Sequence, residues 1–298
     1  MVPMRPITIL KKIFFFVACT AVFVAVLYFF VFPSILESTV DEQNILIVSN
    51  KLDVNSSYIY LAHISQDSEE NSLLLISAQD PVEVPHGYGE YPLQSVYQLL
   101  KIDKKDSQFI QSVFSQLTGV AIDEVVAIDS ALSNVSQTQV SQLFLLSAFN
   151  NLKSLELNSA LKALLLHYKS KHMTVFELDS IENMSDYYAD IPSIFGDLYQ
   201  YCSVAVVNGT NQNGRAAQIG QIIENTGGLV VRLDDAATQH ESTQIYFATD
   251  PVDCSKLAKK ISGVFAQKPE IIPISSLDNA QQYRATVIVI VGEKVTVQ

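Results

Sequence analysis

Three aspartates are the side chains of this sequence best suited to hold a metal ion for catalysis. Asp80, Asp123 and Asp129 could together bind Mg²⁺, because carboxylate oxygens are ligands that this ion prefers. Transfer of a phosphate-bearing group also needs arginine, lysine or a metal to neutralise charge in the transition state. No arginine occurs between Arg5 and Arg215. We therefore expect the aspartates to act as caps and turn residues, and we keep Asp80 as the catalytic candidate.

A second candidate site is the turn Asn208-Gly209-Thr210, which follows a predicted strand and precedes a predicted helix. Asparagine and glycine form strand-to-helix turns readily. Exposed backbone amides at such a turn could bind an anion. The alternative is a tight turn without a ligand.

The cysteines and histidines show no metal-binding pattern. Cys19 lies in an apolar run, Cys202 and Cys254 are far apart, and no Cys or His has the short spacing of a zinc motif. The five histidines are scattered along the chain. We therefore expect no metal and no cofactor, with Mg²⁺ required only if Asp80 is catalytic.

The chain begins with a predicted membrane anchor. Ile13 to Phe32 form an unbroken apolar run, and about 20 helical residues span the hydrocarbon core of a bilayer. Arg5, Lys11 and Lys12 precede the run, so the positive-inside rule places the N-terminus in the cytoplasm. We expect residues 1–36 to be a cytoplasmic tail and single-pass anchor in the cell membrane, with the rest of the chain extracytoplasmic. The alternative, a cleaved signal peptide, is disfavoured by the length of the run.

The charge of the chain excludes one class of partner. There are 19 basic and 31 acidic residues, and three of the basic residues precede the apolar run. Binding to nucleic-acid phosphates needs clusters of lysine and arginine. We therefore expect no nucleic-acid partner, and the acidic surface is interpreted as a source of solubility.

Residues 41–181 are predicted to form an α/β domain, followed by a linker over 182–200. Pro81 to Pro92 holds three prolines and two glycines, so we expect a loop without regular structure there. Asp106 and Gly119 are expected to cap a helix. Short β-branched runs predict strands at 44–48, 57–64, 72–77 and 124–128, and a short strand or extended link at 174–178. Helical periodicity predicts helices at 93–100, 106–117 and 141–170.

Residues 201–298 are predicted to form a second domain in the order βαββαβ, which indicates a ferredoxin-like fold. The strands are expected at 203–207, 229–233, 243–248 and 282–291, and the helices at 214–225 and 251–265. In such a fold the start of the first strand lies beside the end of the third. Cys202 and Cys254 occupy these places and are a candidate disulfide pair, which requires Cα atoms within about 7 Å.

Several motifs of the second domain have family counterparts. They are VAVVNGT at 204–210, NGRAA at 213–217, Gly227-Gly228 and TVIVIVG at 286–292. This pattern resembles the LytR C-terminal domain over Ser203 to Glu293. The resemblance implies a strand, an N-G-T turn and a helix that begins with glycine and small residues.

The first domain carries weaker motifs, ISAQDPVEVP at 76–85 and VAIDEVVAID at 120–129. They resemble the main domain of LytR-CpsA-Psr envelope proteins. That resemblance implies an α/β fold that holds a polyprenyl-pyrophosphate lipid and transfers anionic glycopolymers to peptidoglycan. Gln79 stands where the family has arginine, and the family's Arg-x-Arg segment is missing between Asp129 and Gln139. The domain is therefore interpreted as a shortened, degenerate member of that family.

Together these patterns predict a membrane-anchored cell-envelope protein that is not an enzyme and acts as a scaffold or binding module in cell-wall or glycopolymer assembly. Its expected partners are the membrane and a cell-wall polymer, a polyprenyl lipid or another envelope protein. The alternative is a divergent phosphotransferase that attaches polyprenyl-pyrophosphate-linked glycopolymers to peptidoglycan.

Overall fold

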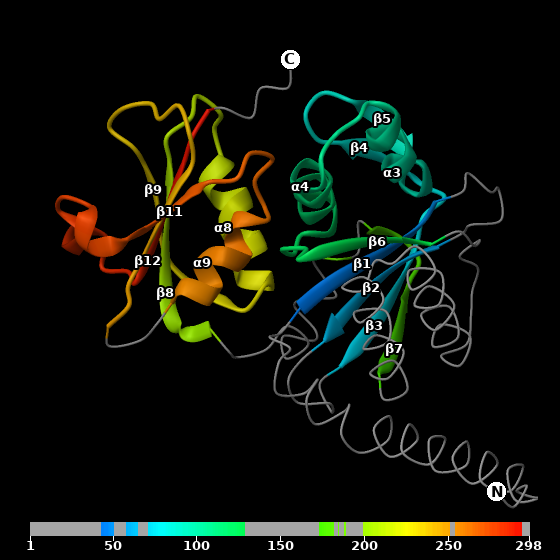
Figure 1. Ribbon diagram of the computed structural model, residues 1–298, viewed down its shortest axis with the longest axis horizontal. Coiled ribbons are helices and arrows are strands. Elements are labelled where there is room, and N and C mark those ends of the chain that lie inside the picture. Colours follow the sequence, from blue (N-terminus) through cyan, green and yellow to red (C-terminus); the bar gives the residue numbers. More distant parts are fainter. Residues whose placement is uncertain are drawn as a thin grey trace, which may run out of the picture. The chain divides into compact units, whose positions relative to one another are not determined.

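The computed structural model describes residues 43–50, 58–64, 71–128, 173–181, 184, 188, 199–250 and 254–293 (Figure 1). Residues 42–298 form one compact unit. The predicted anchor at Ile13 to Phe32, the predicted helices at 141–170 and Asp129 all lie outside the described residues. Within the described ranges, no helix is long and apolar enough to cross a membrane.

The first of two five-stranded sheets, the N-terminal sheet, has the strand order β6-β1-β2-β3-β7. The pairs β1–β2 and β2–β3 are antiparallel, whereas β6 and β7 lie parallel to their neighbours at the two edges. All five predicted strands of the first domain are thereby confirmed. They are β1 (Gln43–Ser49), β2 (Tyr58–Ile64), β3 (Ser72–Ser77), β6 (Glu124–Ile128) and β7 (Thr174–Leu178).

The central strands of this sheet are apolar on both faces, and that pattern explains their burial. Leu46 and Val48 point into a core shared with helices α3 (Leu93–Ile102) and α4 (Ser107–Thr118). Ile45 and Ile47, which face the other way, are equally buried. Near-continuous β-branched and leucine runs are typical of strands that are covered on both faces.

Helix α4 begins and ends where the capping residues predict. The Asp106 carboxylate accepts a hydrogen bond from the Phe109 amide at 2.8 Å, and Gly119 adopts the left-handed conformation with φ 70°. Glycine reaches that conformation without the steric penalty of a Cβ atom. Both capping predictions are confirmed.

The segment over 81–92 corrects one prediction, because it forms a two-stranded hairpin and not an irregular loop. Strand β4 (Pro81–Val84) pairs antiparallel with β5 (Gly89–Pro92). The two prolines face each other at the open end of the hairpin, and proline is tolerated at strand ends and free edges. The alternation of buried Val82 and Val84 with exposed neighbours is the strand signal that the proline count obscured.

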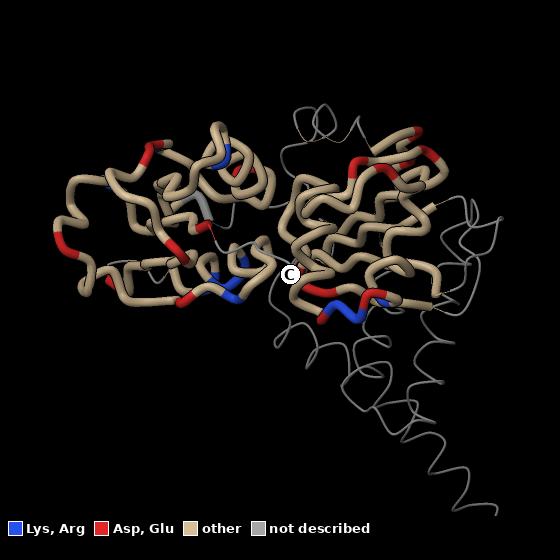
Figure 2. Tube along the Cα trace, turned by 90° about the horizontal axis from the view of Figure 1, so that it is seen from above, with Lys and Arg blue, Asp and Glu red and all other residues tan. Residues whose placement is uncertain are grey.

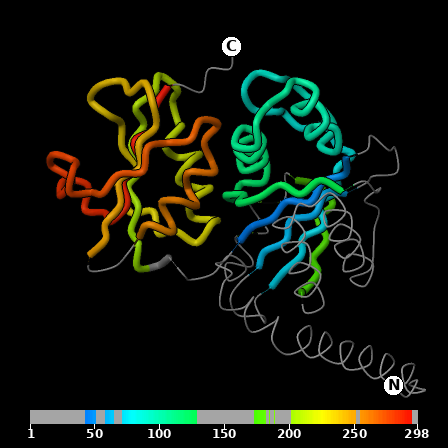
Figure 3. The backbone as a smooth tube through the Cα atoms, in the orientation of Figure 1, coloured from blue at the N-terminus to red at the C-terminus, as the bar shows by residue number. Residues whose placement is uncertain are grey.

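The C-terminal sheet has the order β11-β10-β12-β8-β9 and is coloured from yellow-green to red in Figure 3. Its strands are β8 (Tyr199–Asn208), β9 (Gly228–Asp235), β10 (Gln244–Phe247), β11 (Glu270–Pro273) and β12 (Val287–Val291). Helix α8 (Arg215–Asn225) connects β8 to β9, and helix α9 (Ser255–Ser262) connects β10 to β11.

The predicted ferredoxin-like topology is wrong. A split βαβ unit inserts another strand between its two strands, whereas here β8 lies directly beside β9 and β10 directly beside β11, each pair parallel. The short strand β11 was not predicted, and the last strand starts at Val287, after the 3-10 turn η7 (Ala280–Tyr283). The mixed α/β class of the prediction is confirmed.

The two faces of the C-terminal sheet are covered differently. Helices α8 and α9 pack on one face, where Val204, Val206 and Val289 meet Ile219 and Leu257. The opposite face is covered by the segment that follows β11, including the 3-10 turn η6 (Ile274–Ser276). Its side chains in contact with that face are Ile274, Leu277, Ala280, Tyr283 and Ala285, beside Ile272 of β11.

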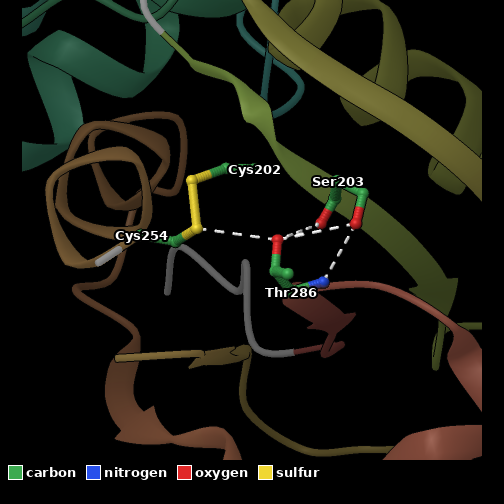
Figure 4. Close-up of a disulfide and its surroundings, with 4 residues drawn as sticks. All are labelled: Cys202, Ser203, Cys254 and Thr286. Atoms are coloured by element: carbon green, nitrogen blue, oxygen red, sulfur yellow. Dashed lines mark hydrogen bonds between the residues drawn. A yellow bond between two sulfur atoms is a disulfide. The ribbon is translucent and has the colours of Figure 1, made fainter. Parts of the chain in front are cut away.

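Cys202 and Cys254 form a disulfide with a Cα–Cα distance of 5.9 Å (Figure 4). Cys202 lies in β8, and Cys254 is the residue before α9. Strand β12 separates β8 from β10, so the bond does not join neighbouring strands as the predicted fold implied. It joins β8 to the start of the helix on the same face, beside Thr286, whose hydroxyl donates to the Ser203 carbonyl at 3.1 Å.

Removal of the disulfide is expected to destabilise the fold strongly. It closes a loop of 52 residues and both cysteines are buried, so the Cys202→Ala/Cys254→Ala variant should lose about 2–4 kcal/mol of unfolding free energy. Urea denaturation with and without a reducing agent measures this loss. A reducing agent should shift the midpoint of the wild type only, and an equal shift in the variant would contradict the assignment.

Candidate functional site

A cavity of about 410 Å³ lies between α3, α4 and β6, and we call it the α3–α4 cavity. Its wall combines lysines, an aromatic ring, amide and hydroxyl groups and two carboxylates. The lining residues are Tyr97, Lys101, Lys105, Ser107, Ile110, Gln111, Asp123, Glu124 and Val125. A volume of this size accommodates part of a small ligand.

The lysines of this cavity were not predicted as site residues, because the sequence from Lys101 to Lys105 resembles a solvated charge run. The structure places both at the wall. The Lys101 ammonium lies 5.9 Å from the centre of the Tyr97 ring, and the Lys105 ammonium lies 3.2 Å from the Asp103 carboxylate. The wall therefore places two ammonium groups beside two carboxylates, in a chain in which acidic residues outnumber basic ones (Figure 2).

Asp123 lines the same cavity and is fixed by several partners. Its carboxylate accepts a hydrogen bond from the Asn44 amide at 2.7 Å and lies 3.6 Å from the ammonium of Lys260 in α9. Gln111 donates to its backbone carbonyl at 2.8 Å. Burial raises the pKa of Asp123, while Lys260 and the Asn44 amide oppose that rise. Asp123 was predicted to be a cap or turn residue, and the structure shows that it also forms a largely buried ion pair with Lys260.

His63 is connected to this ion pair through Asn44. Its Nδ1 lies 2.8 Å from the side-chain oxygen of Asn44, whose amide nitrogen donates to the Ala121 carbonyl at 2.9 Å. Burial, followed by the charge of Lys260, lowers the pKa of His63 to about 3. The imidazole is therefore neutral at pH 7, and the network carries its charge on Asp123 and Lys260.

The structure does not bring the predicted Mg²⁺ ligands together. Asp80 is exposed before β4 and does not line the cavity, whereas Asp123 is engaged with Lys260. Asp129 lies outside the described residues. In the described parts of the chain, no group of three or more His, Cys, Asp or Glu side chains could hold a metal ion.

The backbone amides of Gly209 and Thr210, in the turn Asn208-Gly209-Thr210, already have hydrogen-bond acceptors within the protein. The Gly209 amide donates to the Val291 carbonyl at 2.9 Å, and the Thr210 amide and hydroxyl donate to the Asn208 side-chain oxygen at 3.1 and 2.7 Å. A Cβ atom on Gly209 would lie 2.7 Å from the Val291 oxygen. The turn therefore needs glycine for a close backbone approach, and its amides do not point free toward an anion.

Residues 202–294 match a family described as LytR cell envelope-related transcriptional attenuator. This segment is similar to the LytR C-terminal domain. The match includes the whole C-terminal sheet from Cys202 onward, with its disulfide, and it indicates a cell-envelope-related protein. No curated protein and no solved structure matches the chain. The likeness of the first domain to LytR-CpsA-Psr proteins stays a prediction.

The LytR C-terminal domain contributes directly to the surroundings of the cavity. Its Lys260 neutralises Asp123, and its Ser262 and Phe265 carbonyls accept hydrogen bonds from Gln108 of α4 at 2.9 and 2.8 Å. The cavity wall is therefore held in place by both domains, with α9 and the residues after it making the contacts from the C-terminal side. Chemically it suits a ligand with a negatively charged end near the lysines and an apolar or aromatic-stacking part near Tyr97.

Loss of the Asp123 charge is expected to destabilise the protein. The Lys260 side chain is 4% exposed, so Asp123→Asn leaves a buried ammonium without its counter-ion. Because the Asp123 side chain is 25% exposed, we expect a loss of about 2–4 kcal/mol, at the low end for a broken buried pair. Urea denaturation at pH 7 measures it.

Two comparison variants make this result specific. Adding Lys260→Met removes the unpaired charge and should restore part of the stability. Asp234→Asn breaks the exposed pair of Asp234 with Arg232 and should change the midpoint little. Equal losses in the two aspartate variants would contradict the role assigned to Asp123.

Stability is also expected to fall below neutral pH. An unfolded histidine binds a proton near pH 6.5, whereas folded His63 does so only near pH 3 and His86 near pH 4. The stabilisation is therefore complete above pH 6.5 and decreases as the pH falls, by about 1.4 kcal/mol per pH unit for the buried His63 down to about pH 3. The partly exposed His86 contributes less per pH unit, because solvent screens it, and its contribution ends near pH 4. The His63→Gln variant should show a shallower dependence of unfolding free energy on pH between 6.5 and 4.5, and His86→Gln should flatten it further. An unchanged slope in both variants would refute the assignment.

Proposed function

We propose that the chain is a membrane-tethered, extracytoplasmic envelope protein that binds a cell-envelope polymer or lipid and does not catalyse its transfer. The match of residues 202–294 to an envelope-related family carries this proposal. The buried disulfide supports the compartment, because such bonds persist in oxidising surroundings outside the cytoplasm. The apolar run Ile13 to Phe32 supports the tether.

The binding site in this proposal is the α3–α4 cavity. Lys101 and Lys105 supply positive charge for a phosphate-bearing end group, and Tyr97 and Ile110 supply apolar contact. The ligand class that fits these features is a polyprenyl phosphate or the end of an anionic wall polymer. The lack of an arginine between Arg5 and Arg215 favours binding over phosphoryl transfer, since transfer needs strong neutralisation of transition-state charge.

Lipid binding by the full chain tests this function. In detergent or nanodiscs, the chain is expected to bind polyprenyl phosphate saturably, without requiring Mg²⁺. Lys101→Gln should weaken that binding about ten-fold through the loss of a charge-assisted contact. Lys259→Gln, which removes the same charge from an exposed position on α9, is the matched control and should leave binding unchanged.

Two outcomes would overturn the proposal. A folded chain that binds neither polyprenyl phosphate nor polyprenyl pyrophosphate would lack the proposed activity. Mg²⁺-dependent transfer of a glycopolymer to peptidoglycan that is lost in Asp80→Ala would instead establish the divergent phosphotransferase.

A further inference from the structure

A second polar cluster lies where the β4–β5 hairpin, α4 and the start of α8 meet. His86 comes from the hairpin turn, Gln116 from α4, and Arg215 and Gln218 from the first turns of α8. Hydrogen bonds connect Arg215 to both glutamines, and the charge of Arg215 acts on His86. We call this group the His86–Arg215 cluster.

Arg215 lacks a counter-ion in this cluster. Its guanidinium donates to the side-chain oxygens of Gln218 at 2.6 Å and Gln116 at 3.4 Å. Both acceptors are neutral, and among the described residues no carboxylate forms an ion pair with Arg215. Burial lowers the pKa of Arg215. A guanidinium with five donors and two neutral acceptors has capacity for an anion.

One nitrogen on each of two cluster residues also lacks a hydrogen-bond partner. The Nε2 atoms of His86 and of Gln116 are both shut off from solvent and have no hydrogen-bond partner within the described structure. A buried donor without an acceptor costs about 1–3 kcal/mol. The Gln116 amide nitrogen can only donate, so the missing partner is an acceptor.

His86 is held by its backbone conformation and by packing against Phe109. It adopts the left-handed conformation with φ 68°, which is uncommon for a residue with a side chain. Its ring packs on Phe109 at 4.9 Å between centroids, and the Lys105 ammonium lies 5.1 Å from the same phenyl ring. Backbone strain of this kind concentrates at ligand sites.

The charge around the cluster is positive. The charges of Arg215 and of the nearby Lys105 both act on His86. Lys105 has a carboxylate partner, Asp103, which also accepts a hydrogen bond from the Tyr88 hydroxyl. Donors from three different elements surround the cluster. A carboxylate presents two oxygens in one plane, whereas a phosphate presents several oxygens in different directions and fits such donors better.

We propose that the His86–Arg215 cluster is a binding site for a phosphate group, with Arg215, Gln116 and His86 as its donors. The phosphate belongs either to an envelope lipid or polymer, or to free phosphate. The site is distinct from the α3–α4 cavity and does not depend on the function proposed there.

Titration of the full chain with inorganic phosphate tests the site directly. The wild type is expected to bind phosphate, and Arg215→Gln should weaken binding about ten-fold or more through lost charge-assisted hydrogen bonds. Arg232→Gln is the matched control, because Arg232 is exposed and already paired with Asp234 at 2.5 Å.

A second variant keeps the test decisive if Arg215→Gln fails to fold. Gln116→Glu places a carboxylate beside Arg215, so it should occupy the place of the anion, abolish phosphate binding and keep or raise the unfolding midpoint. Retained phosphate binding in this variant, or an equal loss in Arg232→Gln, would overturn the proposal. The proposal would also be overturned if the wild type bound none of the three ligands phosphate, sulfate and polyprenyl phosphate.

Sulfate serves as a probe whose own charge is constant near neutral pH. Burial, then Arg215 and Lys105, lowers the pKa of His86 to about 4. A bound anion offsets those two cations and raises the pKa again, so sulfate should bind more tightly as the pH falls from 7 to 5.5. His86→Gln should remove this dependence, and a pH-independent wild type would exclude His86 from the site.

A comparison of ligands distinguishes the sources of the phosphate. Polyprenyl phosphate that competes with inorganic phosphate in the wild type, and loses affinity in Gln116→Glu, identifies a lipid head group. Competition by a phosphodiester polymer but not by the lipid identifies a wall polymer. Binding of inorganic phosphate without competition from either identifies free phosphate.

Discussion

The short segment from Thr118 to Asp123 is the connection on which both sheets depend. Two of its backbone groups are satisfied by side chains of the LytR C-terminal domain: Thr226 accepts from the Ala121 amide at 2.9 Å, and Asn225 donates to the Gly119 carbonyl at 2.8 Å. Its last residue pairs with Lys260. Buried backbone groups must find partners, so the Ala121 amide and the Gly119 carbonyl lose theirs unless the C-terminal domain is folded beside the segment.

Both proposed sites follow from this connection. Helix α4 ends at the segment and β6 begins after it, so the segment sets the separation of the two elements that form the α3–α4 cavity. The same helix carries Gln116 to the start of α8, where Arg215 meets it. Lys105 lines the cavity and also contributes charge near His86. A ligand in the α3–α4 cavity and a ligand at the His86–Arg215 cluster would therefore both contact residues of α4.

The sequence predicted those parts whose signals are local. Apolar β-branched runs located the strands of the N-terminal sheet, and Asp106 and Gly119 bounded α4. Prolines masked the alternation of the β4–β5 hairpin, and the four-residue β11 was too short to stand out. The candidate sites were harder to predict, because they join residues that are far apart in the sequence. Lys260 contacts Asp123 and Arg215 contacts Gln116 only in the folded chain. The predictions for the anchor and for 141–170 remain outside the described residues.

The burial of Thr226 and Lys260 bears on how this protein can be divided. The family match starts at Cys202, yet Thr226 is 0% exposed and Lys260 is 7% exposed because residues from the preceding domain cover them. A fragment cut at the family boundary would hydrate that ammonium and uncover a patch shaped for another part of the chain. The segment defined by sequence similarity is thus smaller than the unit that keeps its buried polar groups covered. A LytR C-terminal domain transferred into a different protein therefore needs a substitute for Asp123 and its neighbours.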